Sequence, residues 1–105
     1  MNMDHLKKDI SALLEQYQLL IISWTLKNAE HPSEYSNKVR EIVLGFDPKF
    51  VHFLQVSLDS KDSEEFSSEI LALPCLSLYK DKVEIERFYG EQSMREIETT
   101  IKEYL

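Results

Sequence analysis

The sequence predicts an α/β fold of three layers, α/β/α, in which helices cover both faces of a mixed four-stranded sheet. Continuous apolar runs rich in β-branched residues alternate along the chain with stretches whose apolar residues recur at helical spacing. Two strand patterns near the C-terminus are separated only by Asp81-Lys82, a gap that forces a hairpin. We therefore expect the order α-β-α-β-α-β-β-α in a single domain that covers residues 1–105.

Each element follows from a local pattern. We predict an amphipathic helix over residues 4–16 and a strand buried on both faces over residues 18–25. A second helix carries an apolar stripe from Tyr35 to Phe46 and ends before Asp47-Pro48, because proline disfavours helix in the residue before it. A second buried strand, over residues 50–58, should run parallel to the first through a right-handed crossover. The remaining elements are a short helix from Asp62, strands over 75–80 and 83–88, and a C-terminal helix whose capping box starts at Ser93.

Composition narrows the range of functions. The chain carries a formal charge of −7, and its basic residues are scattered, so we expect neither direct nucleic-acid binding nor docking on a membrane. No apolar run is long enough to span a bilayer, and the N-terminus lacks the pattern of a signal peptide. The single cysteine, Cys75, excludes an internal disulfide and favours the cytoplasm or the nucleus. His5, His31 and His52 lack metal-ligand spacing, so we expect no metal site and no cofactor.

Several local features appear together in the order that the thioredoxin family has. They are Ser23-Trp24 at the end of the first strand, Val56-Ser57-Leu58-Asp59 in the next, Leu73-Pro74 at the position of the family's cis-proline, Lys80-Asp81-Lys82-Val83 at the hairpin, and Gly90 after the last strand. The whole chain thus resembles a thioredoxin-like domain that lacks the first edge strand. The resemblance implies a cis peptide bond before Pro74.

The chain departs from this family at the redox centre. Thioredoxins carry a Cys-x-x-Cys motif at the start of the second helix, where the helix N-terminus lowers the pKa of the thiol. Counting from Trp24 places Asn28 at the first of these positions and either His31 or Ser33 at the second, so neither register supplies a thiol. Ile22 stands where the family has a buried acid. We therefore expect a redox-inactive member that is not an enzyme and has no dithiol oxidoreductase activity.

The leading hypothesis is a non-catalytic protein-binding module, such as an adaptor, an assembly chaperone or a small subunit of a complex. A partner would place an extended segment in the groove beside Leu73-Pro74. The predicted partner-binding residues are Trp24, Leu26, Asn28, His31, Leu73 and Pro74. Trp24, Leu26 and Tyr89 would be partly exposed there, although Trp24 could equally fill the space between the sheet and a helix.

Two alternatives remain open from the sequence. Cys75 could be a reactive thiol that serves a monothiol redox or glutathione-binding function, whereas a free cysteine more often behaves as a small buried apolar residue. The domain could also self-associate through the sheet edge that the missing first strand leaves exposed.

Overall fold

The computed structural model describes residues 5–25, 30–57, 70 and 72–105. Its elements, in chain order, are α1 (His5–Gln16), β1 (Leu19–Thr25), α2 (Glu30–Leu44), β2 (Val51–Ser57), β3 (Cys75–Lys80), β4 (Val83–Tyr89) and α3 (Met94–Tyr104). The helix expected from Asp62 falls outside the described residues.

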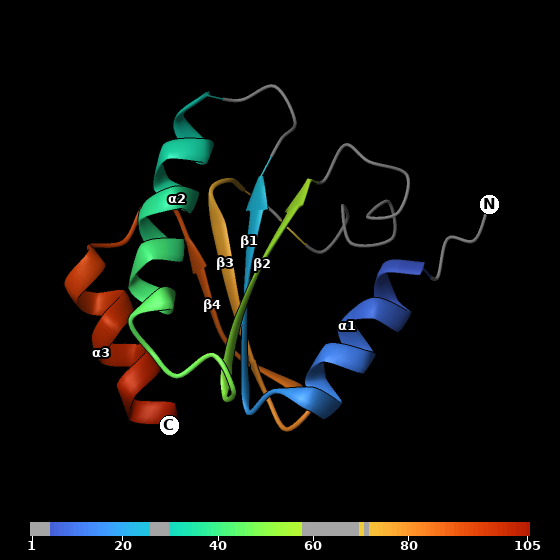
Figure 1. The fold of residues 1–105 in the computed structure, drawn as a ribbon. Coiled ribbons are helices and arrows are strands. Elements are labelled where there is room, and N and C mark those ends of the chain that lie inside the picture. The colour runs from blue at the N-terminus through green and yellow to red at the C-terminus, as the bar shows by residue number, and fades with distance from the viewer. Residues whose placement is uncertain (1–4, 26–29, 58–69, 71) are drawn as a thin grey trace.

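The four strands form one mixed sheet in the order β2-β1-β3-β4. β1 runs parallel to β2 and antiparallel to β3, and β3 runs antiparallel to β4. Helix α1 covers one face of the sheet, and α2 and α3 cover the other (Figure 1). The predicted three-layer α/β architecture with a mixed four-stranded sheet is therefore confirmed.

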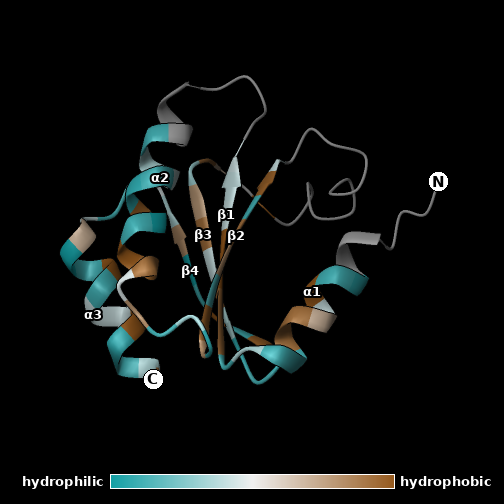
Figure 2. Ribbon diagram, in the orientation of Figure 1, coloured by the Kyte–Doolittle hydropathy of each residue, from teal (hydrophilic) through white to brown (hydrophobic). Residues whose placement is uncertain are grey.

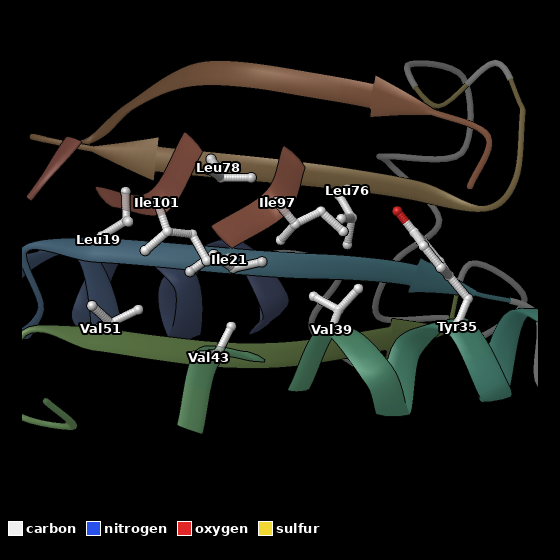
Figure 3. Close-up of a cluster of buried hydrophobic side chains, with 10 residues drawn as sticks. All are labelled: Leu19, Ile21, Tyr35, Val39, Val43, Val51, Leu76, Leu78, Ile97 and Ile101. Carbon is white, nitrogen blue, oxygen red and sulfur yellow. The ribbon is translucent and has the colours of Figure 1, made fainter. Parts of the chain in front are cut away.

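Strand β1 is the centre of the core, because all seven of its residues are buried. Its alternate side chains point into two different clusters, as they must in an extended strand. One cluster lies between the sheet and helices α2 and α3, and Figure 3 shows its ten buried members. The other lies between the sheet and α1, and the apolar side of α1 accordingly faces the strands in Figure 2.

Strand β2 was predicted to be buried throughout, and this expectation is wrong. Only Val51 and Val56 are buried, whereas Gln55 is exposed and the other residues are half-buried. The reason is the strand order, because β2 lies at an edge of the sheet and has β1 on one side only among the described strands. An apolar run does not reveal by itself whether its strand is central or at an edge.

The β3–β4 hairpin turns through Asp81 and Lys82, which both have positive φ angles, of 53° and 68°. Such a two-residue turn matches the right-handed twist of the strands that it joins. At the other end of β4 the chain enters α3, where the Ser93 side chain accepts a hydrogen bond of 3.1 Å from the backbone N–H of Glu96. The predicted start of the C-terminal helix at Ser93 is thus confirmed. Within the part of the chain that the structure describes, no helix is long and apolar enough to cross a membrane.

The cap of α3 gives a test of the fold. Replacing Ser93 with alanine removes the acceptor of the Glu96 N–H, so we expect Ser93→Ala to lower the free energy of unfolding by about 1 kcal/mol. Urea denaturation followed by circular dichroism measures this change. Ser93→Asp keeps an acceptor at the cap and should stay within a few tenths of a kcal/mol of the wild type. Equal losses in both variants would contradict the capping role.

Candidate functional site

The candidate site lies at the end of the sheet that holds the carboxyl end of β1, and all four strands contribute to it. In the register of the sheet, Trp24 stands opposite Cys75 of β3 and Val56 of β2, and Cys75 stands opposite Tyr89 of β4. β-Pairing therefore brings together Trp24 and Cys75, two of the residues that the sequence analysis placed at this end. The side chains at this end of the sheet, however, differ sharply in exposure.

Trp24 is fully buried, with none of its surface exposed to solvent. Its indole N–H donates a hydrogen bond of 3.0 Å to the hydroxyl of Ser77, which is also buried. The ring therefore belongs to the cluster under α1, and its one polar atom is satisfied inside the protein. The expectation that Trp24 is partly exposed and contacts a partner is wrong, and the packing interpretation of this residue holds.

Cys75 is also fully buried, and its setting disfavours the thiolate. Burial is the main cause that raises the pKa of the thiol to about 11, against a smaller opposing effect of Arg87. Ile22, Trp24 and Val56 belong to the same apolar cluster as Cys75, so the position of the family's buried acid is filled by hydrocarbon. The structure thus places Cys75 as a buried packing residue, as a free cysteine more often is, and its reactivity as a thiol stays a prediction.

The exposed part of the site is a small surface that we call the proline surface. It consists of Ala72, Leu73, Pro74, Tyr89 and Gly90. The Leu73–Pro74 peptide bond is cis, and the Gly90 N–H donates a hydrogen bond of 2.8 Å to the Pro74 carbonyl. Leu73 and Pro74 are half-buried, Ala72 is exposed, and Tyr89 exposes 38% of its surface.

A side-chain hydrogen-bond network and a backbone turn also hold the proline surface in place. The Tyr89 hydroxyl accepts a hydrogen bond of 3.2 Å from Arg87, whose guanidinium also binds Glu84 through two hydrogen bonds of 2.8 Å. Gly90 has a φ of +81°, a conformation that other residues adopt only with strain, so the chain can turn sharply after β4. The end of β4 that carries Tyr89 is thus tied to Pro74 through the backbone of Gly90.

Tyr35 ties α2 to the loop that follows this surface. Figure 3 shows the ring reaching from α2 toward the strands. Its hydroxyl accepts a hydrogen bond of 3.0 Å from the backbone N–H of Gln92, two residues after Gly90. Burial raises the pKa of Tyr35, so the hydroxyl stays protonated at neutral pH. Tyr35 was not among the predicted site residues, because only the fold brings it to Gln92. The expectation that Tyr89 is partly exposed is confirmed.

The remaining predicted residues separate into two groups. Leu26 and Asn28 lie outside the described residues, so their expected contacts stay predictions. His31 is the second residue of α2, and the structure describes its backbone but not its side chain. His52 lies in β2, where its ring stacks on that of Tyr17 with centroids 4.5 Å apart. No group of three metal-ligating side chains occurs among the described residues.

Comparisons with known proteins show what the fold resembles. The chain matches no family model, and no curated protein matches its sequence. Among solved structures, it is similar to the thioredoxin of Fasciola hepatica, with a TM-score of 0.77 and 22% identity over 94% of each chain. It is also similar to a Plasmodium falciparum thioredoxin, with a TM-score of 0.75 and 18% identity over 94% of each chain. Mitochondrial thioredoxin 3 of Saccharomyces cerevisiae gives a TM-score of 0.75 and 20% identity over 92% of this chain and 89% of its own.

The chain therefore has the thioredoxin-like fold that its sequence suggested. One expectation needs correction. The absence of both motif cysteines and of the buried acid led us to expect that the chain is not an enzyme, but the structures that it resembles are thioredoxins, which are oxidoreductases. The fold thus gives no ground for excluding an enzymatic activity.

The burial of Cys75 predicts slow chemical labelling. With a pKa of about 11, about one thiol in ten thousand is ionised at pH 7, and the thiolate is the reactive form. We expect the native protein to react with a maleimide or an aromatic disulfide at least about 100-fold more slowly than the same chain unfolded in urea. Labelling of the native protein at the rate of the unfolded chain would contradict this description of Cys75.

The same pKa shift predicts a pH dependence of stability. Folding raises the pKa of Cys75 from 9.0 to about 11, so the unfolded chain loses this proton first as the pH rises. The thiol therefore contributes stability that is complete below pH 9 and is lost as the pH rises to 11. We expect the stability advantage of the wild type over Cys75→Ala to shrink across this window in urea titrations. An advantage that stays constant to pH 11 would contradict the shift.

Proposed function

We propose that this domain is a protein-binding module that holds an extended segment of a partner against the proline surface. An adaptor, an assembly chaperone or a small subunit of a larger complex would each use a domain in this way. Support comes above all from the position of Leu73, Pro74 and Tyr89, which combine apolar surface, exposure and a firmly held backbone at one end of the sheet.

The first support is the rigidity of the proline surface. The Gly90–Pro74 hydrogen bond joins the loop before β3 to the residue after β4, and the Tyr35–Gln92 hydrogen bond joins the next residues to α2. A backbone that is already held in place loses little conformational entropy when it binds. Such a surface can therefore gain affinity from a short segment.

The second support is the chemistry that the surface offers. The half-buried Leu73 and Pro74 and the exposed ring of Tyr89 present apolar area, and Tyr89 also carries a hydroxyl at its rim. Aromatic residues of this kind supply much of the energy at protein interfaces because they bury a large area with few rotatable bonds. The formal charge of −7 favours a segment that is neutral or basic over one that is acidic.

We further propose that Cys75 takes no part in thiol exchange with the bound segment. It is the one cysteine of the chain, it is fully buried, and its pKa is raised to about 11. A domain that binds without a disulfide bond suits a reducing compartment, and we propose that it works in the cytoplasm or the nucleus.

The proposal predicts that changes on the proline surface abolish partner capture. We expect Ala72→Asp and Tyr89→Ala to fold normally, since both residues are exposed, and each to weaken binding of the captured partner by at least about tenfold. Affinity capture followed by calorimetric titration of the purified partner measures the loss. Trp24→Ala is unsuitable as a probe, because removing a buried tryptophan costs about 3–5 kcal/mol of stability.

Val83→Asp is the matched control. Val83 starts the same strand that Tyr89 ends and exposes 60% of its surface, so the variant adds the charge that Ala72→Asp adds, away from Pro74. This control should bind like the wild type. A partner that binds Ala72→Asp and Tyr89→Ala with unchanged affinity would show that its binding surface lies elsewhere.

A further inference from the structure

The two edges of the sheet differ in how they are protected against pairing with another strand. Exposed edges present unpaired N–H and C=O groups, and proteins block them with charges, bulges or proline. β4 has charges and an irregular register, because it carries Glu84, Glu86 and Arg87 and its pairing with β3 shifts at Leu78/Tyr79. A strand that approached β4 would meet an irregular and charged edge.

β2 has none of these features. Its sequence, Val-His-Phe-Leu-Gln-Val-Ser, contains no lysine, arginine, aspartate, glutamate or proline, and its register with β1 runs without a shift from Val51 to Ser57. Burial lowers the pKa of His52, the one titratable side chain of the strand, so this ring is neutral at pH 7. The uncharged edge is therefore available for regular pairing.

The direction of the backbone groups on β2 follows from its ladder with β1. Leu19 N–H donates a hydrogen bond of 2.9 Å to the Phe50 carbonyl, and Leu19 stands opposite Val51. In a regular parallel ladder the polar groups of alternate residues face the partner strand, so His52 and Leu54 bond to β1. The N–H and C=O groups of Phe53 and Gln55 then point away from the sheet.

An apolar hollow of about 250 Å³ lies beside this edge, between the end of α2 and β2. Its lining includes Val43, Leu44, Phe46, Val51 and Phe53. Two large apolar side chains near the hollow are strongly exposed, since Leu44, which lines it, shows 70% of its surface and Phe50, which precedes Val51, shows 50%. The edge of β2 therefore combines outward-facing backbone groups with uncovered apolar surface.

We propose that β2 pairs with β2 of a second copy of this chain, antiparallel about a two-fold axis, to form a continuous eight-stranded sheet. An isologous contact requires a surface that complements itself, and an uncharged strand meets this condition. The hollow and the exposed Leu44 and Phe50 lie at the amino-terminal end of β2, so antiparallel pairing places this apolar surface of each copy beside the carboxyl end of the partner's β2.

Charge favours this strand over other surfaces for the contact. Two copies with a formal charge of −7 each repel one another unless their interface avoids acidic groups. Beside the uncharged β2, Arg40 is the one charged residue that lines the hollow, while Asp47 and Lys49 flank its lining residue Pro48 in sequence and offset each other in charge. β2 is thus a place where the acidic chain can approach its own copy without acidic side chains of the two strands facing each other.

Sedimentation equilibrium of the full chain tests this proposal. We expect the wild type to have twice the mass of one chain at micromolar concentration, and Gln55→Glu to raise the dissociation constant by at least about tenfold, because like charges across a strand pair repel. Gln55 is exposed and accepts a hydrogen bond of 3.0 Å from Ser36, which glutamate can also accept. Val83→Glu adds the same charge to the edge of β4 and should leave the dimer intact.

Amide hydrogen exchange locates the contact without any substitution. The outward-facing N–H groups of Phe53 and Gln55 should exchange slowly at high protein concentration and at least about tenfold faster on dilution to the monomer. Those of His52 and Leu54 bond to β1 and should be slow at both concentrations. A wild type that is monomeric at high concentration overturns the proposal. A dimer in which the amides of Phe53 and Gln55 exchange fast, or in which Gln55→Glu changes nothing, also overturns it.

Discussion

The complete burial of β1 is the constraint on which the rest of the structure depends. Seven consecutive residues without exposed surface need a neighbouring strand on each side and a helical layer on each face. β2 and β3 supply the strands, α1 covers one face, and α2 and α3 cover the other. Because β1 is central, its carboxyl end lies between the end of β2 and the start of β3.

This arrangement separates two environments within one end of the sheet. Beneath the surface, Trp24 and Cys75 stand opposite each other in apolar packing, where the indole finds one buried acceptor and the thiol keeps its proton. At the surface, Pro74 directly precedes Cys75 in the chain, and Tyr89 stands opposite Cys75 on the edge strand β4, where both Pro74 and Tyr89 reach solvent. Position at the edge of the sheet or before the first residue of β3, rather than the face of the strand, distinguishes these two residues from Cys75.

Much of the fold could be predicted from local sequence patterns, because those patterns act over a few residues. The apolar run from Leu19 to Ile22 predicted the central strand, and the gap at Asp81-Lys82 predicted the hairpin. The burial of Trp24 could not be predicted over its exposure, because the acceptor of its indole N–H is Ser77, which lies 53 residues further along the chain. The edge position of β2 could not be predicted from the sequence for a related reason. An uncharged strand has the same composition whether neighbouring strands or a second protein would cover it.

The asymmetry between the two edges of the sheet has a consequence for how many further strands the sheet can add. A sheet with two open edges can add strands at both ends, and repeated addition leads to a fibre. Here the shift at Leu78/Tyr79 and the charges of β4 close one end. Among the strands that the structure describes, a strand that joins at β2 therefore uses the one edge that remains open, so assembly through this sheet is self-limiting.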